Sequence, residues 1–222
     1  YDDALTKEEN RQLAREFLMQ VQRGDYFQMA ANYYYGIGAH SMIFTEDYDL
    51  PNDVAYSETC ASIGLALFAR RMSLLDPDSI YADVAETAIY NCALAGVSLN
   101  GKAFFYINPL EINMERSRKN KEYYEYKGSS FNTVQRLEVF DCSCCPPNIA
   151  RMIASIGDFL YTYNDDTVFV HHYFESDAEF EGIKITQNTE YPHNGAVRLT
   201  VKGMAGKTLA VRIPGWAQNC AV

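Results

Sequence analysis

The chain has 222 residues, of which 48% are hydrophobic and 14% aromatic, and its formal charge is −10. That length and composition suffice for a buried core, while the negative charge and the lack of a Lys/Arg stripe exclude nucleic acid as a partner. The longest apolar stretches, such as 61–68, are too short to span a membrane, and the start Tyr1-Asp2-Asp3 has no signal-peptide character. We therefore expect a soluble cytoplasmic protein without membrane contact, and homo-oligomerisation stays open.

Four helices are predicted before residue 165. The first, 6–23, begins at a Thr-x-x-Glu capping box, and a second covers 56–75. A third follows the turn at Asp76-Pro77 and runs on to Asn100-Gly101, with apolar residues at four-residue intervals. Pro146-Pro147 suits the first turn of a fourth helix, which should end near Asn164.

The last quarter of the chain predicts strands. Its segments are rich in β-branched residues and are separated by Gly and Asn turns: 168–170, 180–186, 196–202 and 209–213. We expect these strands to pair antiparallel. The fold class is therefore mainly α followed by β, with a helical domain over 1–165 and a β segment over 166–222.

Three of the six cysteines lie in one run, Cys142-Ser143-Cys144-Cys145. Adjacent cysteines pair with each other only in a strained ring, whereas two thiolates can share a thiophilic cation. Together with Glu58 and Cys60 upstream, Cys144 and Cys145 offer one oxygen and three sulfur donors, which suits tetrahedral zinc (Zn). The competing interpretation is that these cysteines are small core residues and a buried turn.

Six ordered motifs resemble glycoside hydrolase family 127, the β-L-arabinofuranosidases formerly catalogued as a domain of unknown function. They lie within about 35–217, and the double-cysteine motif is the most specific. The motifs are DYDLPND (47–53), YSETCASIG (56–64), YADVAE (81–86), FFYINPL (104–110), CSCCPPN (142–148) and VRIPGW (211–216).

The resemblance implies the later half of an (α/α)6 barrel followed by the start of a β-sandwich, and hence part of a longer protein. It implies zinc held by Glu58, Cys60, Cys144 and Cys145, with Cys144 also the nucleophile of a retaining reaction on an arabinofuranoside or related plant-type carbohydrate. Glu86 and Tyr106 match positions that contact sugar hydroxyls. Without the family, Glu86 could be an exposed helix carboxylate and Tyr106 a core residue.

One position departs from the family pattern. The family carries a general-acid glutamate on a loop where this chain has Ala39-His40-Ser41-Met42-Ile43, with Met42 nearest the position. No carboxylate is present in that stretch, and a lone loop histidine such as His40 is a weak substitute. The leading interpretation is a zinc-dependent glycosidase that is partial or impaired. The alternatives are a catalytically silent carbohydrate-binding or structural homologue that keeps zinc, and a structural-zinc module without a sugar role.

Overall fold

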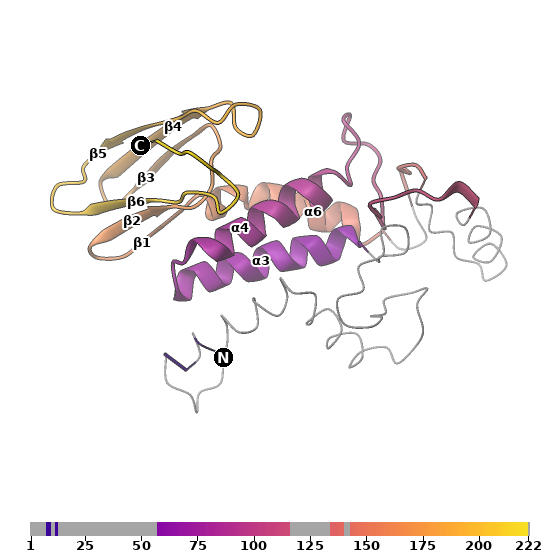
Figure 1. The fold of residues 1–222 in the computed structure, drawn as a ribbon, viewed down its shortest axis with the longest axis horizontal. Helices are drawn as coiled ribbons and strands as arrows, with labels where there is room; N and C mark the ends of the chain where they lie inside the picture. The colour runs from indigo at the N-terminus through magenta and orange to yellow at the C-terminus, as the bar shows by residue number, and fades with distance from the viewer. Residues whose placement is uncertain (1–7, 10–11, 13–56, 116–133, 140–142, 222) are drawn as a thin grey trace.

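The computed structural model describes residues 8–9, 12, 57–115, 134–139 and 143–221. Most of the predicted helix 6–23, the loop 39–43 and Cys142 lie outside these residues. Within the described residues, helices come first and two small sheets follow (Figure 1). The coarse prediction of α followed by β is confirmed, whereas the barrel, the sandwich and the boundary at 165 stay predictions.

Two antiparallel helices form the centre of the helical part: α3 (Thr59–Leu75) and α4 (Ser79–Ala88). Their shared core includes Ala66 and Ala69 of α3 and Ala85 of α4, and these small side chains allow the helix axes to approach closely. The Asp78 side chain caps α4 by accepting a hydrogen bond from the Ile80 N–H at 3.1 Å. Both helices lie where the sequence predicts them.

The third predicted helix changes its hydrogen bonding before it ends. After α4 the chain continues as the π-helix η1 (Ile89–Leu94), and Gly96 donates its N–H to the carbonyl of Cys92 at 2.8 Å. The helix therefore stops before the predicted signal at Asn100-Gly101. The hydrogen bond between the Phe105 N–H and the Gly96 carbonyl, 2.8 Å long, directs this part of the chain toward the segment 104–107 instead.

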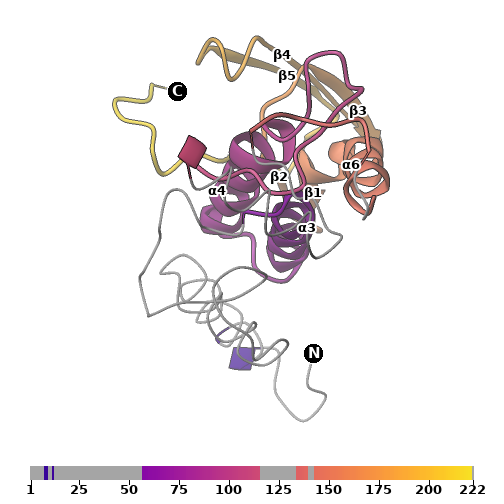
Figure 2. The ribbon, with the colours of Figure 1, turned by 90° about the vertical axis from the view of Figure 1, so that its right-hand side faces the viewer.

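The fourth predicted helix is shorter than expected. It comprises α6 (Cys145–Ala154) and the 3-10 turn η2 (Ile156–Phe159), and a strand, β1 (Tyr161–Tyr163), replaces its last residues. Ser155 explains the break, because its hydroxyl donates to the carbonyl of Arg151 at 3.0 Å. Figure 2 looks along α3, α4 and α6, and direct contacts confirm that α6 packs against α3.

The strands form two three-stranded sheets, ordered β1-β2-β6 and β3-β4-β5. Besides β1, the strands are β2 (Thr167–Val170), β3 (Ser176–Phe180), β4 (Ile183–Thr189), β5 (Val197–Lys202) and β6 (Thr208–Val211).

Two predictions about the strands are wrong. The segment 180–186 is not one strand but joins the end of β3 to the first half of β4 through a hairpin turn, because Glu181 and Gly182 both adopt positive φ, 49° and 79°, as a tight two-residue turn requires. The strands are also not all antiparallel, since β2 pairs with β6 in parallel, with Val168 opposite Leu209. That parallel pair is possible because the whole β3-β4-β5 sheet lies between the two strands in sequence and serves as the crossover.

The two sheets share an apolar core. Val168 of β2 and Ile183 and Ile185 of β4 are almost fully buried, and they cluster with partly buried side chains from β1, β5 and β6. In the described part of the chain no helix is long and apolar enough to cross a membrane.

Candidate metal and catalytic site

The N-terminal ends of α3 and α6 meet at the predicted donor set. Glu58 precedes α3 as its N-cap and Cys60 lies in its first turn, while Cys144 is the N-cap of α6 and Cys145 its first residue. Helix N-termini carry partial positive charge, which favours thiolates and carboxylates. The meeting of the two helix N-termini therefore brings the side chains of two motifs that are distant in sequence to one place, and favours their negatively charged forms.

All four predicted donors form one cluster, in which the ligand atoms lie within 4.8 Å of one another. The Cys60 sulfur is 3.5 Å from that of Cys144 and 3.6 Å from that of Cys145, and the sulfurs of Cys144 and Cys145 are 3.9 Å apart. The Cys144 sulfur lies 3.9 Å from Glu58 Oε1. A tetrahedron with Zn–S bonds of about 2.3 Å has S···S edges of roughly 3.8 Å, so the donor set fits zinc.

Glu58 and Cys60 converge because the chain changes conformation between them. Glu58 is extended, with φ −72° and ψ 132°, and pairs with Ile107 as an isolated β-bridge, whereas Cys60 is helical. The neighbouring Ser57 carbonyl accepts the Asn108 N–H at 2.9 Å. Two residues that would diverge on a regular helix thus reach the same centre.

The cluster combines a buried thiol with more accessible donors. Cys145 is fully buried, and burial, followed by the proximity of Cys60 and Cys144, raises the pKa of its thiol. Cys144, Cys60 and Glu58 are half-buried, so a second molecule can approach Cys144. Cys92 is not among the four clustered metal-ligand candidates, and its sulfur lies instead against the carbonyl of Ser57 at 3.8 Å.

Tyr106 lies beside the metal donors but faces the core. Its side chain is 3% exposed and belongs to the main helical core, and its carbonyl accepts the Thr59 N–H at 3.1 Å. Its position next to the cluster agrees with the expected sugar contact, while its burial agrees with the core alternative. Its role stays a prediction.

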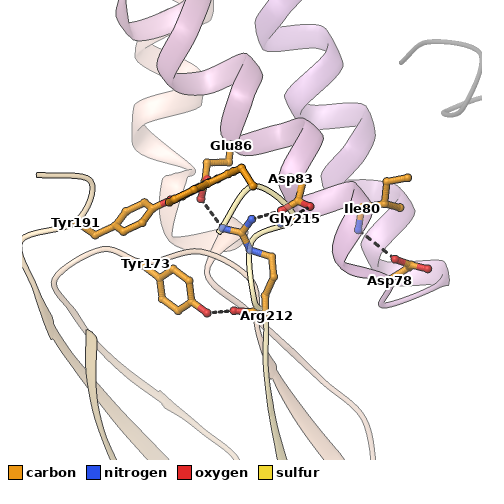
Figure 3. A network of polar contacts seen from close by, with 9 residues as sticks. Asp78, Ile80, Asp83, Glu86, Tyr173, Tyr191, Arg212 and Gly215 are labelled. Atoms are coloured by element: carbon orange, nitrogen blue, oxygen red, sulfur yellow. Dashed lines mark hydrogen bonds and ion pairs between the residues drawn. The ribbon is translucent and has the colours of Figure 1, made fainter. Parts of the chain in front are cut away.

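Glu86 is not an exposed helix carboxylate, because it is 6% exposed and bonded on both oxygens (Figure 3). Oε1 accepts the Tyr191 hydroxyl at 2.8 Å and the Trp216 indole N–H at 3.0 Å. Oε2 pairs with the guanidinium of Arg212. The alternative that Glu86 is an exposed helix carboxylate is therefore wrong, and its contact with sugar stays a prediction.

Arg212 connects α4 to the β segment, and it is the residue that sequence reasoning missed. Its side chain is 2% exposed and bridges Glu86 and Asp83, whose Oδ1 lies 2.5 Å from its Nη1. Asp83 also accepts the Gly215 N–H at 3.0 Å (Figure 3). Two signals were available, namely two carboxylates three positions apart on one helix face, and a lone arginine in an apolar run.

The comparisons with known proteins agree with the motifs. The model of the "Beta-L-arabinofuranosidase, GH127 catalytic domain" matches residues 16–158, and that of the "GH127 middle domain" matches residues 167–222. A non-reducing end β-L-arabinofuranosidase from Bifidobacterium longum subsp. longum is 39% identical over 184 residues. The aligned region is 79% of this chain and 27% of that protein, so the chain spans about a quarter of its relative's length.

Solved structures give the same result. A family 127 β-L-arabinofuranosidase from Geobacillus stearothermophilus T6 superimposes with a TM-score of 0.67 at 44% identity, covering 82% of this chain and 29% of that one. A second family 127 β-arabinofuranosidase gives 0.65 at 38% identity, covering 81% and 27%. The matched catalytic-domain family and the superimposed structures identify the class as glycoside hydrolase. The chain belongs to glycoside hydrolase family 127.

Proposed function

We propose that this chain is part of a zinc-dependent retaining β-L-arabinofuranosidase. The observation that supports the proposal most directly is the Glu58–Cys60–Cys144–Cys145 cluster, whose sulfurs are spaced for a tetrahedral ion. The substrate class, an arabinofuranoside, is proposed from the activity of two relatives. Zinc bound at the cluster would keep the coordinating thiols deprotonated at neutral pH, where a free cysteine is mostly protonated.

Cys144 is the proposed nucleophile because the resemblance to the family places that role there, and its half-buried position makes it reachable, unlike Cys145. Its sulfur attacks the anomeric carbon as the bond from that carbon to the leaving-group oxygen breaks, and the oxygen takes a proton from an acid. A water molecule then attacks the same carbon, its proton goes to a base, and the electron pair of the C–S bond returns to sulfur. Two inversions give net retention.

Glu86 and Tyr106 are the proposed sugar-binding residues of this site. Glu86 has one acceptor position left on Oε2 after the contact with Arg212, because a carboxylate offers about four lone-pair directions. A sugar hydroxyl could donate there. Glu86 is held by the helix α4, and Tyr106 lies in an irregular segment whose backbone is held by the hydrogen bond from the Thr59 N–H.

The second candidate is a homologue that keeps zinc without turnover. It is favoured by one observation, that residues 39–43 carry no carboxylate where the family places its acid. A positioned acid contributes about 10²- to 10⁴-fold, so its loss would slow the cleavage of unactivated substrates most. Hydrolysis of an activated aryl arabinofuranoside, which needs little protonation of its leaving group, is expected of the enzyme and not of the silent homologue, so it separates the two candidates.

Metal analysis tests the proposal directly. We expect one zinc per chain, and we expect Cys60→Ser to lose the metal and to lower the melting temperature, because bound zinc contributes its binding free energy to folding. Cys220→Ser is the control, since Cys220 is an exposed thiol outside the cluster. A native chain without zinc, together with unchanged metal content and stability in Cys60→Ser, would refute the site.

A further inference from the structure

Thr59 stands between two metal donors yet belongs to a different contact network. Its side chain is fully buried, and its hydroxyl donates to the Phe105 carbonyl at 2.7 Å. Its backbone N–H donates to the next carbonyl, that of Tyr106, at 3.1 Å. One residue therefore makes two hydrogen bonds to consecutive carbonyls of the segment that carries Tyr106.

These two bonds fix the point at which the chain turns from extended to helical. Glu58 is still extended and Cys60 is already helical, so the direction of each donor depends on where that transition falls. A shift of the transition by one residue would turn either the carboxylate or the sulfur away from the centre, because residues two apart on a helix face different directions. The Thr59 bonds therefore set the spacing of half of the donor set.

The packing behind Thr59 is tight enough to enforce this position. A β-carbon added to Gly96 would lie 2.8 Å from the Thr59 hydroxyl, closer than real contacts allow, and 3.1 Å from the Cys92 carbonyl, which is a tight contact. Gly96 itself is held by the hydrogen bond from the Phe105 N–H to its carbonyl, 2.8 Å long. Thr59, Gly96 and Phe105 thus form one buried unit behind the donors.

We propose that Thr59 is a positioning residue for the metal centre, with Gly96 as the small residue that leaves room for its hydroxyl. The proposal rests on the proposed zinc site and adds a residue that binds no metal itself. Residues outside the ligand shell that orient ligands typically change metal affinity by about 10- to 100-fold when replaced. Through its two hydrogen bonds to the segment 105–106, Thr59 also connects the proposed metal ligands Glu58 and Cys60 to Tyr106.

The test measures metal affinity by competition with a chromogenic chelator, using Zn²⁺ and, as a second thiophilic probe, Cd²⁺. We expect Thr59→Val, which has the same shape without the hydroxyl, to weaken binding about 10- to 100-fold, and Thr59→Ser to restore most of the affinity. Ser73→Ala is the matched control. It removes a buried hydroxyl on the same helix, bonded to Ala69 at 3.2 Å, and should lower the melting temperature without changing affinity.

A second pair of variants covers the case in which Thr59→Val does not fold. Gly96→Ala should weaken binding by displacing the Thr59 hydroxyl, whereas Gly64→Ala on α3 adds the same methyl with nothing within 4 Å and should not. Unchanged metal affinity in Thr59→Val or Gly96→Ala, with melting temperatures lowered as in Ser73→Ala, would overturn the positioning role of Thr59. It would leave the proposed zinc site intact. A wild-type chain that binds neither ion would refute the zinc site and the inference with it.

Discussion

At the residue scale, Cys144 is distinguished from the other described cysteines by its surroundings. It caps α6, it is half-buried, and its sulfur has two thiols and a carboxylate within 3.9 Å. Cys145 shares the cluster but is fully buried, and Cys220 is accessible but lies outside the cluster. Cys60 shares both access and the cluster, so the resemblance to the family, which places the nucleophile at Cys144, decides between these two thiols.

A covalent probe should therefore modify Cys144 selectively. With an arabinofuranose-configured electrophile, in a preparation that hydrolyses an activated aryl arabinofuranoside, we expect the label on Cys144 and not on Cys142, because only the former matches the nucleophile of the family. Peptide mass spectrometry locates the label, and Cys220 reports nonspecific alkylation. Modification of Cys142, or no modification despite turnover, would contradict the assignment.

At the element scale, the joint between η2 and the β1-β2-β6 sheet contains two buried histidines that directly follow β2. His171 Nε2 is 2.6 Å from the Thr162 hydroxyl, and the ring of His172 lies edge-on to Phe159. Burial, followed by the positive charge of Arg212, lowers the pKa of His171 to about 4 and that of His172 to about 3. Both histidines are therefore neutral in the folded chain at pH 7.

This joint should make the fold sensitive to acid. The unfolded histidines take up protons near their usual pKa of about 6.5, whereas the folded ones do not until pH 4 or below. Their contribution to stability is complete above about pH 6.5 and is lost as the pH falls, by up to about 1.4 kcal/mol per pH unit for each histidine.

Urea unfolding at pH 7 and pH 5 measures the effect. We expect His172→Gln to be less stable than wild type at pH 7 but to lose less stability between the two pH values. The exposed His193, replaced by Gln, is the control and should follow wild type. An equal pH dependence in His172→Gln and wild type would contradict the prediction.

At the scale of the whole molecule, one arginine connects the helical part to the β segment. Arg212 reaches Glu86 and Asp83 across 126 and 129 positions of sequence, and the only tryptophan of the chain, Trp216, bonds to the same glutamate. The Trp216 ring also stacks on Tyr191, with ring centres 6.3 Å apart. Tryptophan fluorescence is therefore a specific reporter of this contact.

We expect Arg212→Met to destabilise the chain by about 3–5 kcal/mol, because it leaves a buried carboxylate without its cation. The emission of Trp216 should change before global unfolding, as its contact with Glu86 loosens. Lys184→Met is the control, because it removes an exposed ion pair with Glu179. It should lower the free energy of unfolding by less than about 1 kcal/mol. Wild-type stability and emission in Arg212→Met would show that the network does not hold the two parts together.

The sequence by itself determined the features that depend on local spacing and residue chemistry. The positions of α3 and α4, the start of α6 and the four donors could all be predicted, because capping, helical periodicity and thiolate chemistry are properties of short segments. The tertiary structure decided everything that depends on distant partners. Contacts with the segment 104–107 ended the third helix early, and Ser155 ended the fourth. Arg212 paired with both carboxylates of α4, those of Asp83 and Glu86. No local pattern reveals these outcomes, since a hydrogen bond or an ion pair gains its value only when folding brings its two partners out of water together.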